Sequence, residues 1–376
     1  RQMCIRDRSI AELRAPAFRG ALRYWLRALL GVGQDAEAVY EAESRVFGNT
    51  SQGSAVALRL RGQTSSQNWY PPRAQAGIQY LLFSIRQRDP QTRQDVIRPS
   101  IPAGTTFSLI IQQRANPNDP TPMEQTLNAL WLLCNLGGLG ARSRRGLGSL
   151  AVRSVVSGNR LNECVERLQQ SARTPQELAA NLQNGFQAMR HDLRSVGDGD
   201  LPEFDILHPD HCRIIVVKRT WRRWEDTMEA LGQHFKAFRS NMDDRRKVGN
   251  ALQHRGDGLE TIKRAAFGLP IVFFYRGIGQ SSLEGEEHDR RASPLHFHIT
   301  KLANGTYTIV LTCFKARLLA PATEKKQAEQ LKLPSLDRRT VIEIPPPDLT
   351  ILDEFLDQLN SKSNNVPLGE PLEVTL

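Results

Sequence analysis

The stretch GGLGARSRRGLGSL, residues 137–150, decides how this chain is interpreted. Two Gly-x-Gly pairs enclose a basic core, and the residues concerned are Gly138, Gly140, Arg142, Ser143, Arg144, Arg145, Gly146 and Gly148. Glycine permits positive φ and a close approach of ligand to backbone. Arginine offers a planar fork of donors that suits phosphate. The pattern, after an apolar helix expected over residues 123–136, therefore predicts a loop that holds a polyanion.

The charge of the chain is unevenly distributed. The formal net charge is +10 over 376 residues, and residues 1–150 hold 19 Arg, no Lys and 10 acidic residues. An excess made only of arginine in one part of the chain favours a nucleic-acid partner over a generally basic surface. No apolar run approaches the roughly 20 residues of a membrane-spanning helix, so no membrane partner is expected. The five cysteines form no CxxC pair, which indicates a reducing, cytoplasmic setting.

The order of expected elements predicts an α+β fold with two ferredoxin-like domains. Apolar residues at helical spacing predict helices over 19–31 and 36–47, and β-forming runs predict strands over 54–61, 79–85, 105–112 and 147–156. The first domain, residues 9–156, lacks the strand that should precede its first helix. Residues 1–8 are interpreted as an artefactual extension.

The second half of the chain repeats this alternation after a polar helical connector, residues 157–200. Strands are expected over 204–207, 213–218, 270–275, 295–300 and 307–314, with helices over 221–238 and 349–359. Residues 277–291 are expected to form a surface loop, and the tail after residue 361 to be loosely ordered. Residues 201–376 are therefore interpreted as a second, degenerate ferredoxin-like domain.

These motifs resemble those of the RAMP superfamily of CRISPR-associated proteins, whose hallmark is a glycine-rich loop between the last helix and last strand of a ferredoxin-like domain. Within it, PAFRGALRYWLRALLG (16–31), AESRVFG (42–48), FGLPIVFFY (267–275) and RRASPLHFHITKL (290–302) are similar to the first RAMP subunit of the type III-B (Cmr) effector complex. The resemblance implies a non-catalytic subunit that binds crRNA toward its 3′ end, or the crRNA–target RNA duplex. Other RAMP subunits would be its protein partners, and no cofactor is implied.

Three basic segments are the candidate RNA-binding sites. The loop is the first, and the second is a ridge on helix 19–31 whose arginines lie four residues apart. The third, around residue 218, interleaves basic and aromatic residues, a pattern that suits a single strand. The candidates outside the loop are Arg14, Arg19, Arg23, Tyr24 and Arg27, followed by Lys218, Arg219 and Arg222. The ridge has a structural alternative, in which its arginines pair with acids such as Glu37, Glu41 and Glu43.

A different class of function remains open from the sequence. His296 and His298 alternate with apolar residues, so both imidazoles lie on one face of a strand. One could accept the 2′-OH proton and the other could protonate the leaving group, as in a metal-independent RAMP endoribonuclease that processes crRNA. The alternative is the polar face of a half-buried sheet. His208, His211 and Cys212 lack a fourth ligand, so no metal site is assigned. A scaffold that contacts mainly protein neighbours is a third possibility.

Overall fold

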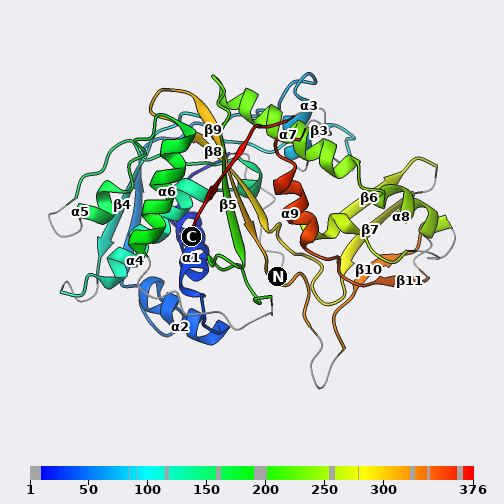
Figure 1. Cartoon of the computed structure of the whole chain (residues 1–376), viewed down its shortest axis with the longest axis horizontal. Coiled ribbons are helices and arrows are strands. Elements are labelled where there is room, and N and C mark those ends of the chain that lie inside the picture. The colour runs from blue at the N-terminus through cyan, green and yellow to red at the C-terminus, as the bar shows by residue number, and fades with distance from the viewer. Residues whose placement is uncertain are drawn as a thin grey trace.

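The computed structural model describes residues 10–83, 85–89, 91–114, 118–157, 162–189, 201–253, 259–277, 279–321, 327–336, 339–361 and 367–376. The interpretation of residues 1–8 lies outside this range. The chain has mixed α/β structure with small antiparallel sheets. Figure 1 shows its N-terminal helices at the left and a small sheet with its own helix at the right.

The first part of the chain packs helices against a two-stranded sheet. Its helices are α1 (Ala15–Leu30), α2 (Ala36–Phe47), α3 (Ala76–Leu81) and α4 (Thr121–Leu136), and its strands are β1 (Val56–Arg61), β2 (Arg86–Arg88), β3 (Asp95–Ile97) and β4 (Ser108–Gln113). β1 pairs with β4, and β2 with β3, both antiparallel. Proline in the first turn suits the start of α1, and Asp35 caps α2 by accepting the N–H of Ala38 at 2.8 Å.

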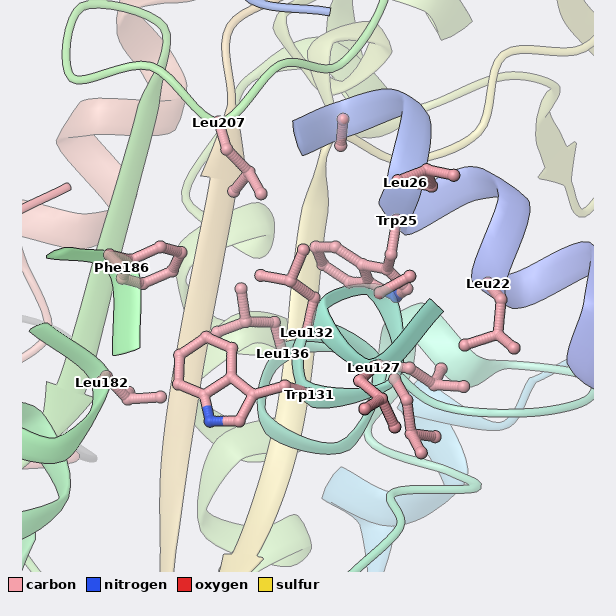
Figure 2. Packing of buried hydrophobic residues seen from close by; sticks show 14 of the residues in the cluster. Leu22, Trp25, Leu26, Leu127, Trp131, Leu132, Leu136, Leu182, Phe186 and Leu207 are labelled. Atoms are coloured by element: carbon pink, nitrogen blue, oxygen red, sulfur yellow. The ribbon is translucent and has the colours of Figure 1, made fainter. Parts of the chain in front are cut away.

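The apolar face of α1 forms the core of this part. Leu22, Trp25 and Leu26 are buried and face α4, as the helical spacing predicts. Figure 2 also shows Trp131 of α4 pointing toward Phe186, and their ring centroids lie 5.4 Å apart. Phe186 belongs to α6 (Pro175–Met189), which follows the short α5 (Asn162–Glu166). The described part of the connector therefore contains two helices, α5 and α6, and α6 is packed into the core.

A four-stranded antiparallel sheet lies at the centre of the molecule. Its order is β12 (Pro371–Val374), β5 (Cys212–Val217), β9 (Tyr307–Phe314) and β8 (Leu295–Lys301). Successive residues of β5 point to opposite faces of the sheet, so Ile214 and Ile215 are buried in different cores. One face meets α1 and α4, while the other meets α7 (Trp224–Ser240) and α9 (Thr350–Asp357). Both faces are covered, so β5, β8 and β9 are buried along almost their whole length.

A smaller unit forms a third core. Strands β6 (Ile271–Tyr275), β7 (Gly279–Gly285), β10 (Leu331–Pro334) and β11 (Val341–Ile344) form a sheet in the order β11-β10-β7-β6. α8 (Asp244–Gln253) packs against it, and Val248 joins Phe273 in the cluster. The short 3-10 helix η2 (Lys263–Phe267) connects this unit to the central core. The expectation of a surface loop over 277–291 is wrong, because β7 lies within it.

Three further expectations are corrected. Residues 79–85 form no strand, because α3 packs on α7, where Glu229 accepts the N–H groups of Gly77 and Ile78 at 2.9 Å each. Residues 147–156 and 204–207 are not strands either. Residues 206 and 207 are nevertheless buried, and Leu207 donates its N–H to Ala28. The tail is not loosely ordered throughout, since β12 pairs with β5.

Candidate nucleic-acid interface

The glycine-rich loop is closed on itself by its backbone. Leu139 donates its N–H to the carbonyl of Gly148 at 3.0 Å, and residues 143–145 form the 3-10 helix η1 between them. Gly140, Gly146 and Gly148 have positive φ, and so does Arg142 at 64°. A Cβ at Gly148 would lie 1.9 Å from the carbonyl oxygen of Leu139. Glycine is therefore required at position 148 by both backbone conformation and space.

The loop docks on β8, the edge strand of the central sheet. The N–H of Ile299 donates to the hydroxyl of Ser149 at 3.1 Å, so the loop occupies a donor that an edge strand would otherwise leave open. On the face toward α4, His298 Nδ1 donates to the carbonyl of Gly137 at 2.6 Å. Gly146 lies on the other side, where a Cβ would meet Ile299 at 3.5 Å. The loop thus straddles the strand.

Arg144 lies on the α1 side of β8. Its guanidinium donates to the carbonyl of Ser293, lies 3.5 Å from a carboxylate oxygen of Asp205, and sits 5.0 Å from the ring centroid of Tyr24. Its side chain is 24% exposed and that of Asp205 is 7% exposed. Arg144 therefore connects the loop to the second half of the chain through a nearly buried ion pair.

Tyr24 belongs to the same polar group and points inward. Its hydroxyl donates to Asp205 at 2.8 Å, and its ring stacks on His296 at 5.6 Å. Burial, followed by the charge of Asp205, raises the pKa of Tyr24. Burial and the charges of Arg144 and Arg145 hold the pKa of His296 well below its ordinary value. Tyr24 is one of the candidate RNA-binding residues from the sequence. Its ring is not open for a base to stack on, since His296 and Arg144 already contact it.

Arg145 lies on the opposite side of β8. Its guanidinium carbon is 4.9 Å from the ring centroid of Phe235 and 5.4 Å from that of Phe297. Its Nη2 donates to the carbonyl of Phe267 at 3.4 Å. Both rings belong to the core between the central sheet and α7. The sequence pattern predicts that Arg145 is one of several arginines of a polyanion-binding loop. In the structure its guanidinium is not exposed on the loop but packs on core aromatic rings.

Further arginines approach the loop, and the sequence pattern gave no sign of them. Burial is the largest cause that lowers the pKa of Arg142, and the charge of Arg98 lowers it further. The pKa of Arg145 is likewise lowered first by burial and then by the charge of Arg239. Arg264 donates from its side chain to the backbone carbonyl of Arg239 at 2.7 Å. These residues are remote from the loop in sequence, so only the tertiary structure brings them together. Their concentration beside the loop is a property that suits an anion.

Residues 6–151 match the model of the RAMP superfamily. The chain is also similar to the CRISPR system Cmr subunit Cmr1-1 of Pyrococcus furiosus, with 26% identity over 318 residues, 82% of each protein. Cmr1-2 of the same organism is 29% identical over 168 residues, which are 39% of this chain and 88% of that protein.

The fold of this chain is also similar to a solved structure. The crystal structure of Cmr1 from Pyrococcus furiosus in its apo form has a TM-score of 0.57 and 21% sequence identity to this chain. The similarity covers 96% of this chain and 91% of that one. The resemblance inferred from the sequence motifs is therefore confirmed.

The arginine ridge on α1 is divided between free and paired side chains. Glu43, only 1% exposed, accepts ion pairs from Arg23 and Arg27, and Arg23 also donates to the carbonyls of Phe47 and Gly48. Arg14 pairs with Glu12 at 3.3 Å. The structural alternative is thus correct for Glu43. Arg19 has no acidic partner in the described part of the chain, and it lines a hollow of about 450 Å³.

The segment before α7 remains at the surface. Lys218 pairs with Glu370 at 2.6 Å, and Arg219 lies 5.2 Å from the ring centroid of Trp221. Arg222 is exposed and has no partner among the described residues. Trp224 is half-buried against Trp69, with 5.6 Å between ring centroids. The predicted interleaving of cations and aromatics is present here, and its role in binding RNA stays a prediction.

The histidine pair does not form an accessible acid–base site. His296 is 4% exposed and His298 is 1% exposed. His296 contacts the rings of Tyr24 and Trp25 on α1, and His298 contacts the carbonyl of Gly137 at the end of α4. Burial lowers the pKa of His298 to about 4, so the imidazole is neutral at pH 7. The alternative that assigns catalysis to these two residues is corrected, because both imidazoles are buried. The polar-face interpretation is also incomplete, since α1 and the end of α4 cover that face.

No group of three or more His, Cys, Asp or Glu side chains within the described ranges is arranged to hold a metal ion. His208 and His211 lie near each other, with ring centroids 5.8 Å apart, but they gather no further ligands. Among the described helices, none combines the length and the apolar character that crossing a bilayer requires.

Proposed function

We propose that this protein is a non-catalytic RNA-binding subunit of a type III-B CRISPR ribonucleoprotein effector in antiviral defence. It holds crRNA toward the 3′ end of the guide, or the crRNA–target RNA duplex, and it assembles with other RAMP subunits in the cytoplasm. Homology to Cmr1 over 82% of the chain supports the place in the complex. Two ferredoxin-like domains, 9–156 and 201–376, are the corresponding architectural proposal.

The proposal of RNA binding rests on arginine side chains at the glycine-rich loop whose positive charge is not neutralised by a carboxylate of the described residues. Arg142 of the loop and the exposed Arg98 have no acidic partner among the described residues, and they are near enough for one to lower the pKa of the other. Such a surface binds a sugar–phosphate backbone through charge and counterion release and leaves sequence reading to base pairing. Gly138, Gly140 and Ser143 offer backbone and hydroxyl donors along the same path.

A salt series on RNA binding tests the proposal. The double variant Arg98→Gln/Arg142→Gln should weaken binding of single-stranded RNAs of unrelated sequence alike. It should flatten the slope of log K against log salt by about 1.4, since each phosphate contact on a single strand contributes about 0.7. Arg246→Gln is the matched control, because that side chain is 70% exposed and already paired with Asp243. An unchanged slope in the folded double variant would contradict this use of the loop.

A further inference from the structure

Four arginines form a series of neighbouring guanidinium groups where the glycine-rich loop contacts the second half of the chain. Arg145 lies near Arg142 and Arg239, and Arg239 lies near Arg264. Arg142 and Arg145 come from the loop, Arg239 from α7 and Arg264 from η2. The guanidinium carbons of Arg145 and Arg239 both lie over the ring of Phe235, at 4.9 and 5.4 Å from its centroid. We call these four residues the arginine cluster.

The partners of the arginine cluster are neutral. Arg145 donates to the carbonyl of Phe267, Arg239 donates to the hydroxyl of Tyr80 at 3.0 Å, and Arg264 donates to a backbone carbonyl. None of the ion pairs formed by described residues includes a member of the cluster. The nearby carboxylate of Asp244 accepts backbone N–H groups of residues 263 and 264.

Each member also keeps a donor that nothing satisfies. The atoms are Arg142 Nε, Arg145 Nη1, Arg239 Nε and Arg264 Nε, which are buried without a hydrogen-bond partner in the described structure. A buried donor without an acceptor costs roughly 1–3 kcal/mol, and more when it is charged. Burial and the neighbouring charges of Arg239 and Arg142 lower the pKa of Arg145 to about 9. Natural proteins leave few such groups unpaired, so four together point to an absent anionic partner.

We propose that the arginine cluster binds one phosphate group, and that this phosphate stabilises the docking of the loop against α7 and η2. The inference rests on the proposed function, in which the phosphate belongs to an RNA backbone, but it is narrower. It assigns a discrete, desolvated phosphate site made by both halves of the chain, rather than a diffuse basic surface. Charge-assisted hydrogen bonds to one phosphate would satisfy the open donors and offset the repulsion among the four cations.

Thermal unfolding of the full chain with inorganic phosphate tests the site without RNA. Phosphate should raise the Tm by about 2–4 °C at tenfold excess over its Kd, while chloride at the same ionic strength should not. Arg145→Gln should lose this shift, and Arg142→Gln, at a less buried position, serves if the first variant fails to fold. Arg246→Gln should keep the shift. A dinucleoside phosphodiester, added in parallel, distinguishes an internal RNA phosphate from a terminal one.

The outcomes separate this inference from the proposed function. Wild-type protein that binds RNA but shows no phosphate-specific rise in Tm overturns the site and leaves RNA binding in place. A rise that persists in both Arg145→Gln and Arg142→Gln also overturns it. A rise that is lost in those variants supports the site, even when the protein binds no RNA, and that last result would contradict the proposed function alone.

Discussion

Two arginine-containing segments of this chain look alike in sequence and differ in structure. In the loop, Arg144 and Arg145 are drawn against Tyr24, Phe235 and the backbone of the second half of the chain. In the segment before α7, Arg219 and Arg222 remain exposed. The difference teaches that tertiary packing decides whether a guanidinium beside aromatic residues is held against the protein or stays open to solvent. The loop acts first as the joint between the two halves.

The strongest test of this contrast concerns the backbone of the loop. Gly148→Ala should destabilise the protein by about 3–5 kcal/mol, because positive φ and a backbone clash act together. Gly140 also has positive φ, but a Cβ there meets nothing within 4 Å. Gly140→Ala should therefore cost only about 1–2 kcal/mol. Denaturant unfolding measures both values, and equal losses would show that the close approach of Leu139 to position 148 does not constrain the loop.

Acid sensitivity provides the next test of the joint. The pKa of His298 falls to about 4 in the folded state because of burial, whereas it is near 6.5 in the unfolded chain. Between these values the unfolded state binds more protons, so stability rises with pH and is lost as pH falls from about 6.5 to 4. The loss from this residue is about 3 kcal/mol at pH 4.

His298→Gln keeps a donor for the carbonyl of Gly137 and removes the titration. Its free energy of unfolding should therefore vary less between pH 7 and pH 4 than that of the wild type. An exposed histidine, His288→Gln, is the control, since its side chain is 71% exposed. If both variants retain the wild-type acid profile, the buried imidazole does not link loop docking to pH.

The smallest effect compares one arginine from each segment. Arg144→Gln should lower the free energy of unfolding by about 2 kcal/mol, because it leaves the nearly buried Asp205 with a weaker partner. The loss is smaller than for a fully buried ion pair because the side chain of Arg144 is 24% exposed. Arg222→Gln should change stability by no more than about 0.5 kcal/mol. Thermal unfolding in the same buffer measures the pair. Similar shifts in Tm would mean that the loop arginine is no more structural than the exposed one.

Much of the local structure could be predicted from the sequence. The helical spacing of Leu22, Trp25 and Leu26 gave α1 and its buried face, and β-rich runs gave β1, β5, β8 and β9. The misses have physical causes. The run QYLLFSI over 79–85 favours a strand by composition, but it begins within α3, which packs as a helix on α7. Polar β7 is a strand because β6 and β10 pair with it. Tertiary contacts override weak local preference in both cases.

The candidate site was predicted in part. Glycine at 140, 146 and 148 was correctly linked to an unusual backbone, because a doubled Gly-x-Gly has few other uses. The direction of each arginine was not predictable, since the acids and rings that meet them lie far away in the chain. Asp205 is 61 residues from Arg144, and Phe235 lies on α7. Arg239 and Arg264 carried no motif that would have marked them.

The sequence by itself determined the excess of arginine, the periodicity of the elements and the glycine positions, because each depends on residue type and spacing along the chain. Only the tertiary structure decided which cations are neutralised, which aromatic faces are covered and which donors remain open. Those properties depend on desolvation and on contacts between residues distant in sequence. The sequence of the arginine-rich loop therefore predicts phosphate binding, whereas in the structure the loop joins the two halves of the chain and keeps unpaired donors.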